Sequence, residues 1–303
     1  MYRDGQDKVL LFLEQNFCLG YDFEEKQWYK QMQLPTKEKL PGDIFYNSDC
    51  ITCQAHIINM RTMKMLLRTG KTFWFGNMIQ QLTAAWKEIQ NSKIEGEKRP
   101  FYFKLSGSKI IAIGRESSRE VPTDKVSVFD LNHTDQGWRR IASLNRADLT
   151  FNLVTNEGVM FAFSSEEKYY EYYDESLNNW TIVRPPKWPK LDFMANVSHD
   201  GLIYVTCATR DERRPLYSYD PSKKIWNRLA DYLSFRTSDH DLLSYRNSLV
   251  KIDYNQIEIY DIEDAKTWKV INNDSPTSFG VCLVKKSMLD KSDKIKDIRN
   301  LDM

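Results

Sequence analysis

Residues 201–226 read GLIYVTCATRDERRPLYSYDPSKKIW, and this stretch decides the fold. An apolar run rich in β-branched and aromatic residues follows Gly201, a charged connection comes next, and a second apolar run ends in Tyr219-Asp220. Short runs of this kind between turn signals indicate β-strands. The Asp carboxylate can accept hydrogen bonds from backbone N–H groups two residues on and so begin a turn, after which Trp226 leads a further strand. The stretch therefore predicts a meander of antiparallel strands.

The same pattern recurs along the chain. Aromatic-Asp pairs precede a polar turn and a Trp at Tyr21-Asp22 and Trp28, Phe129-Asp130 and Trp138, Tyr173-Asp174 and Trp180, Tyr219-Asp220 and Trp226, and Tyr260-Asp261 and Trp268. Trp86 marks a sixth unit, which has no such pair. These six tryptophans lie 42 to 58 residues apart, near the roughly 40–50-residue period of propeller blades. Two more apolar runs precede each pair, so each unit predicts four antiparallel strands, called a, b, c and d in chain order, with the Trp packed between blades.

The two ends of the chain complement each other. The first unit begins with a run at residues 9–13 that corresponds to strand b, so its strand a is missing. Residues 279–284 form one further apolar run after the last Trp. Pairing this run with the first unit would leave no open sheet edge, which is how circular β architectures avoid aggregation.

The predicted fold is therefore all-β, a six-bladed β-propeller over residues 1–285 that a C-terminal strand closes by completing the first blade. The predicted blades comprise residues 8–34 plus 278–285, 49–90, 100–144, 148–184, 191–230 and 238–272. Residues 286–303 form a polar C-terminal tail, which we expect to be disordered or a short surface helix.

Composition limits the function classes. The 303 residues carry 43 Lys plus Arg against 42 Asp plus Glu, so no global field directs the chain toward nucleic acid or an acidic membrane. No run approaches the roughly 18 apolar residues of a membrane helix. The odd number of cysteines, five, and a start without an apolar leader predict reduced thiols and a cytoplasmic protein, with the nucleus as a second compartment.

The repeat of apolar strand, aromatic-Asp pair, polar turn and Trp resembles the Kelch β-propeller, in particular the Kelch domain of BTB-BACK-Kelch adaptors. Family repeats usually carry a Gly-Gly pair after strand b, which this chain lacks, so another propeller subfamily is the alternative. The resemblance implies a substrate receptor of a cullin-3 RING ubiquitin ligase. The BTB and BACK domains that would bind the cullin are absent from this chain.

The meander places the b–c and d–a connections at one end of the propeller, and arginines are concentrated in these connections. Arginine suits bidentate recognition of carboxylates and is enriched at binding hot spots. Trp188, in a connection between blades, is a candidate exposed anchor. By resemblance, Arg146 and Arg236 stand where the family often has an Arg at the start of strand a. We therefore predict that this end binds a protein or peptide through Arg115, Arg119, Arg146, Arg184, Trp188, Arg210, Arg213, Arg214 and Arg236.

The sequence indicates no catalytic residues, metal or cofactor. Cys50 and Cys53 form a CxxC without the second ligand pair that structural zinc needs, which favours buried thiols. Nucleophile-elbow, P-loop and dinucleotide motifs are absent. Two alternatives stay open: a cytoskeletal, actin-associated or scaffolding Kelch protein, and an enzyme with its site in the central channel, where three of the four histidines, His56, His199 and His240, could converge.

Overall fold

The chain is all-β throughout the part that the computed structural model describes. The described residues are 8–13, 17–33, 55–59, 64–69, 72–77, 87–88, 99–106, 108–115, 124–147, 151–164, 169–184, 192–208, 215–231, 241–253, 256–264, 267–273, 280–285, 291 and 294–295. They form antiparallel strands, turns and one short 3-10 helix, η1 (Thr134–Gln136). No helix among them is long and apolar enough to span a membrane.

The chain divides into two compact units, one of residues 1–92, 254–258 and 270–303 and one of residues 93–253 and 259–269. The first unit contains a sheet of the order β24-β1-β2-β3-β25 and a sheet of the order β4-β5-β6-β7. The strands of the first sheet are β24 (Gly280–Lys285), β1 (Lys8–Leu13), β2 (Phe17–Asp22), β3 (Gln27–Gln33) and β25 (Lys294–Ile295). The strands of the second sheet are β4 (Ala55–Asn59), β5 (Lys64–Thr69), β6 (Thr72–Asn77) and β7 (Lys87–Glu88).

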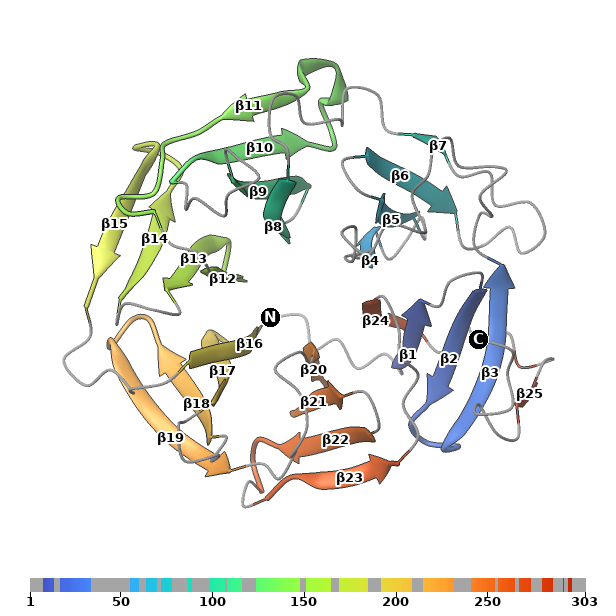
Figure 1. Cartoon of the computed structure of the whole chain (residues 1–303). Helices are drawn as coiled ribbons and strands as arrows, with labels where there is room; N and C mark the ends of the chain where they lie inside the picture. The colour runs from blue at the N-terminus through green and yellow to red at the C-terminus, as the bar shows by residue number, and fades with distance from the viewer. Residues whose placement is uncertain are drawn as a thin grey trace. The chain divides into compact units, whose positions relative to one another are not determined.

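The second unit contains three four-stranded sheets whose neighbouring strands are consecutive in the chain (Figure 1). The first has β8 (Arg99–Ser106), β9 (Lys109–Arg115), β10 (Val126–Asp130) and β11 (Trp138–Arg140). The next two have β12 (Phe151–Asn156), β13 (Val159–Ser164), β14 (Tyr170–Asp174) and β15 (Asn179–Val183), then β16 (Asp192–His199), β17 (Leu202–Ala208), β18 (Pro215–Asp220) and β19 (Ile225–Asp231). A further four-stranded sheet has β20 (Asp241–Tyr245), β21 (Ser248–Asp253), β22 (Gln256–Asp261) and β23 (Lys269–Asn272).

The predicted pairing of the chain's terminal runs is present. β24 pairs antiparallel with β1, from Lys8 opposite Lys285 to Leu13 opposite Gly280. In three of the later units, the apolar run directly before the strand of the aromatic-Asp pair corresponds to β9, β13 and β21. The blade boundaries as such stay a prediction.

The turn predicted after each aromatic-Asp pair has the expected hydrogen bonds. Asp174 Oδ1 accepts the backbone N–H groups of Ser176 at 2.9 Å and Leu177 at 3.2 Å. Asp220 Oδ1 accepts those of Ser222 at 3.0 Å and Lys223 at 3.1 Å. The Oδ1 atoms of Asp22, Asp130 and Asp261 accept the N–H group two residues on in the same way. Each carboxylate therefore satisfies backbone donors that the turn would otherwise leave without a partner.

The aromatic residue before each Asp faces the following Trp across the two strands. Tyr173 is the register partner of Trp180 and Tyr219 of Trp226, with ring centroids 5.1 and 4.6 Å apart. Such cross-strand aromatic pairs stabilise a sheet. Trp28 and Trp180 are buried, as predicted for the core, whereas Trp138, Trp226 and Trp268 are partly exposed. Trp86 lies outside the described residues.

The core of the second unit lies between sheets. One cluster joins the β8–β11 and β12–β15 sheets and includes Ile111, Val128, Met160 and Trp180. Another joins the β12–β15 and β16–β19 sheets and includes Phe163, Tyr170 and Tyr219. The first strands of the sheets are also in contact, since β12 touches β8 and β16, and β16 touches β20.

The polar tail differs from the expectation of disorder or helix at the residues described. Lys294 and Ile295 form β25, which pairs with β3 opposite Tyr29 and Trp28. Ile295 is buried there, and Lys291 forms an ion pair with Glu25.

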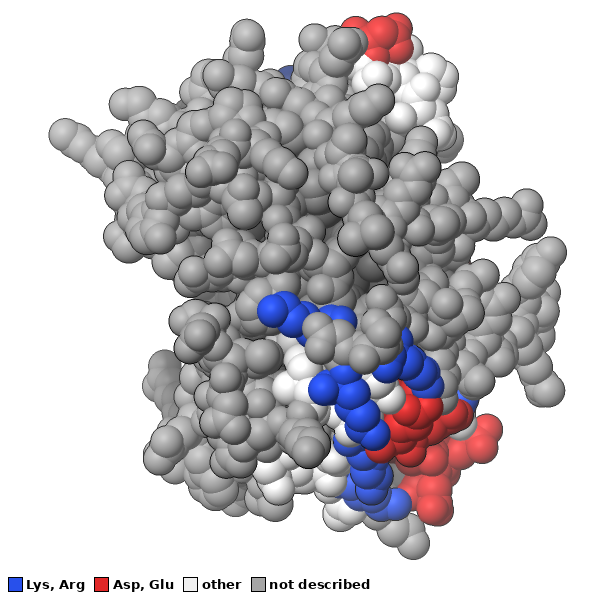
Figure 2. Space-filling view, turned by 90° about the vertical axis from the view of Figure 1, so that its right-hand side faces the viewer, with Lys and Arg blue, Asp and Glu red and all other residues white. Residues whose placement is uncertain are grey.

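On the face shown in Figure 2, described basic side chains border acidic ones instead of forming a continuous field of one sign.

Trp180→Ala should destabilise the protein by about 3–5 kcal/mol, because it opens a cavity between two sheets. It also removes the hydrogen bond from Trp180 Nε1 to the Ala142 carbonyl oxygen, 2.9 Å long. Urea denaturation of this variant and of Trp138→Ala measures the effect. We expect a smaller loss for Trp138→Ala because that ring is partly exposed, and equal losses would contradict the assignment of Trp180 to the core.

Candidate functional site

The structure describes the side chains of two of the predicted binding residues, Arg146 and Arg184. Arg146 precedes β12 and Arg184 follows β15, so both lie in d–a connections. Arg115 ends β9, and its side chain is not among those described. The other predicted residues lie outside the described part of the chain: Arg119, Trp188, Arg210, Arg213, Arg214 and Arg236.

Arg146 and Arg184 converge on one aromatic ring. Their guanidinium carbons lie 5.8 and 5.6 Å from the centroid of Tyr169, which precedes β14. The Tyr169 side chain is buried, whereas both arginines are exposed. A cation near an aromatic ring is attracted by the ring's quadrupole, worth about 0.5–1 kcal/mol at exposed sites. The ring therefore restrains two cationic side chains that are far apart in the sequence, and it brings the b–c connection that carries Tyr169 together with two d–a connections.

A buried carboxylate lies beneath this arginine pair. Glu171, on β14, is fully buried, and its Oε2 atom accepts the backbone N–H and the side-chain Nδ2 of Asn145, both at 2.8 Å. Asn145 Nδ2 also donates to the Trp180 carbonyl oxygen at 2.6 Å. These bonds fix the segment that carries Arg146 against the β12–β15 sheet. Burial raises the pKa of Glu171, while the hydrogen bonds from Asn145 and the charge of Arg146 oppose that rise.

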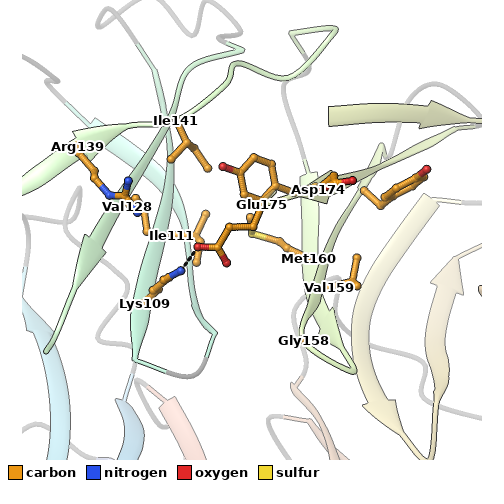
Figure 3. A pocket seen from close by; sticks show the side chains of 12 residues that line it. Lys109, Ile111, Val128, Arg139, Ile141, Gly158, Val159, Met160, Asp174 and Glu175 are labelled. Carbon is orange, nitrogen blue, oxygen red and sulfur yellow. Dashed lines mark hydrogen bonds and ion pairs between the residues drawn. The ribbon is translucent and has the colours of Figure 1, made fainter. Parts of the chain in front are cut away.

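A pocket of about 350 Å³ opens at the other end of this sheet, between the β8–β11 and β12–β15 sheets (Figure 3). Its aliphatic lining comes from Ile111, Val128, Ile141, Val159 and Met160, and the Tyr172 and Tyr173 rings line it as well. It lies beside the a–b turn at Gly158 and the c–d turn at Glu175, and so at the end where no binding residue was predicted. No motif marks this pocket in the sequence, because its lining comes from strands that are distant in the chain.

Four charged residues line the pocket. Lys109 and Glu175 form an ion pair between the two sheets, drawn in Figure 3. Asp174 is engaged by its own turn, where the side-chain hydrogen bond from Ser176 is the main cause that lowers its pKa. Arg139, on β11, is exposed and has no carboxylate partner among the described residues.

Two histidine side chains are described, those of His133 and His199, and each contacts residues close to it in the structure. His199 Nδ1 lies 2.7 Å from Ser244 Oγ, and its Nε2 lies 3.6 Å from a carboxylate oxygen of Asp200. His133 pairs with Asp130 in the turn after β10. The described residues contain no group of three or more His, Cys, Asp or Glu that could hold a metal ion. His56 lies on β4, but its side chain is not described, and His240, Cys50 and Cys53 lie outside the described residues. The convergence of His56, His199 and His240 therefore stays a prediction.

No protein-family profile matches the chain, and no curated protein is significantly similar to it in sequence.

Glu171→Gln should remove a pH dependence of stability that the wild type has. Because burial raises the pKa of Glu171 above its usual value of 4.5, ionisation is harder in the folded protein than in the unfolded chain. The carboxyl group therefore disfavours folding increasingly as the pH rises from below 4.5 through its raised pKa. Urea denaturation between pH 4 and 8 should show the wild type losing stability relative to the variant over that window, whereas a constant difference would contradict the assignment.

Proposed function

We propose that the chain is a non-catalytic protein-binding module built on a six-bladed, Kelch-like propeller. Four features support the propeller: the recurring four-stranded sheets, the Asp-capped c–d turns, the contacts between first strands, and the pairing of β24 with β1. A rigid set of sheets that presents connections at one end suits recognition of a partner segment. In this proposal the b–c and d–a connections hold that segment.

The observation that carries the proposal is the arginine pair on Tyr169. Two guanidinium groups held on a buried ring lose less side-chain freedom on binding than two free arginines would. Their donors point to a partner with carboxylates, since Arg and carboxylate form strong charge-assisted hydrogen bonds. The partner is therefore an acidic protein segment, bound without metal, cofactor or nucleic acid.

The Kelch resemblance extends this proposal to the role of the module. As part of a BTB-BACK-Kelch adaptor, it would present a protein substrate to a cullin-3 RING ubiquitin ligase in the cytoplasm or the nucleus. Binding of the cullin would depend on the BTB and BACK domains of such an adaptor.

An Arg146→Glu/Arg184→Glu variant should lose peptide binding and keep its fold. A displayed peptide library is selected against the immobilised wild-type chain, and the selected peptide is synthesised with a fluorophore. Fluorescence anisotropy then gives its Kd for each protein. We expect an acidic peptide and at least a tenfold weaker Kd for the variant, because a hydrogen bond to a charged group is worth about 1.5–3 kcal/mol.

The matched control is Lys224→Glu/Lys269→Glu, which makes the same change in charge. Lys224 lies in the c–d turn after β18 and Lys269 begins β23, and both side chains are exposed. This control should bind the peptide as the wild type does. Equal weakening by both variants would show a general charge effect and would reject the arginine end, as would selection of peptides without acidic residues.

A further inference from the structure

The pocket between the β8–β11 and β12–β15 sheets lies where β9 and β10 present aliphatic side chains, while Tyr172 and Tyr173 of β14 also line it. On β9 and β10 the cross-strand pairs facing it are Ile111 with Val128 and Ile113 with Val126. At the equivalent positions of the next sheet the pairs are Phe161 with Tyr172 and Phe163 with Tyr170. These rings pack into the following interface, and Tyr172 also reaches the lining of this pocket. The smaller aliphatic side chains leave space, so the pocket is a property of this interface and not of the repeat.

Arg139 is also particular to this interface. It is the register partner of Val128, so its side chain lies on the same face of the sheet as the apolar lining. The equivalent partners in the next two sheets are neutral, Thr181 opposite Tyr172 and Asn227 opposite Ser218. The sequence therefore departs from its own repeat twice at this interface. Ile111 and Val128 stand where the next sheet has aromatic residues, and Arg139 stands where the next two sheets have neutral ones.

The four charged residues that line the pocket sum to zero, but Arg139 is the one whose side chain neither pairs across the interface nor bonds within its own turn. The Lys109 ammonium is paired with the Glu175 carboxylate, and the Asp174 carboxylate accepts hydrogen bonds from Ser176. Arg139 has no such partner among the described residues. A ligand that complements this pocket has an apolar body for the aliphatic lining and one anionic group for the guanidinium.

We propose that this pocket binds a small amphipathic anion, with a compact apolar body and a single carboxylate or similar group. The volume of about 350 Å³ is within the usual range of small-molecule sites, about 300–1,000 Å³. The apolar body lies against Ile111, Val128 and Met160, and the anionic group accepts hydrogen bonds from Arg139. This site lies at the opposite end of the β12–β15 sheet from the arginine pair on Tyr169 and does not depend on the proposed peptide binding.

Isothermal titration with 2-naphthoate and with octanoate tests the proposal, and 2-naphthamide serves as the uncharged analogue. Naphthoate should bind at least tenfold more tightly than naphthamide, because the amide cannot form a charge-assisted bond with Arg139. Arg139→Gln should weaken naphthoate at least tenfold and leave naphthamide unchanged. Arg140→Gln is the matched control, since Arg140 is the next residue of β11, opposite Ser127 and on the other face of the sheet.

Val128→Tyr tests the cavity without a change in charge. It places in β10 the residue type that the next sheet has at the equivalent position, Tyr172, and it should fill the pocket and abolish binding of both carboxylates. A circular dichroism spectrum and a Tm confirm that the variant folds. For a variant that fails to fold, Val128→Phe and Ile111→Phe repeat the test at the same register pair.

Several results would overturn the proposal. These are no binding of either carboxylate to the wild type at millimolar concentration, equal affinity for naphthoate and naphthamide, or full binding to Arg139→Gln or to a folded Val128→Tyr variant. The Arg146→Glu/Arg184→Glu protein should bind naphthoate normally, so a failure of peptide binding and a failure of this pocket can be told apart. Loss of naphthoate binding in that protein would also contradict the proposed site.

Discussion

An aspartate carboxylate holds the turn between the third and fourth strands in sheet after sheet, and the rest of each sheet depends on that turn. In the turn after β18, Asp220 Oδ1 accepts two backbone N–H groups, and Lys224 then adopts a positive φ of 58° before Trp226. The turn after β14 repeats this with Asn178 at 46° before Trp180. A slip of one residue in the strand pairing would turn every side chain of the strand to the opposite face of the sheet. The fixed length of the turn therefore decides which side chains face the core.

The same turn brings the aromatic residue before the Asp opposite the Trp that follows it, and this pairing contributes to how neighbouring sheets pack. Trp180 is buried against the β8–β11 sheet and donates to the Ala142 carbonyl oxygen. Asn145, three residues further along the chain, then bonds both to the Trp180 carbonyl oxygen and to Glu171. The connection that carries Arg146 is therefore held by the core contact of the Trp, and the position of the arginine pair follows from it.

The two ends of the β12–β15 sheet offer different chemistry. At the b–c end, two exposed guanidinium groups lie near one buried ring, an arrangement suited to an extended acidic segment. At the a–b and c–d end, one guanidinium lies beside an aliphatic pocket, an arrangement suited to a small ligand. The difference arises from side chains that the repeat leaves variable, because the turn and the Trp pair fix only the frame.

The sequence by itself determined the strands, the meander and the turns, because these depend on contacts within a few residues or between consecutive strands. It also indicated the pairing of β24 with β1 and the end of the sheets where Arg146 and Arg184 lie. The tertiary structure decided which side chains meet across two sheets. Three features depend on packing between residues that are distant in the chain. They are the hydrogen bonds from Asn145 to Glu171, the contacts of Arg146 and Arg184 with Tyr169, and the pocket beside Arg139. The β25 strand likewise forms by pairing with the edge of β3, which is distant in the chain, so the charged sequence of the tail did not predict it.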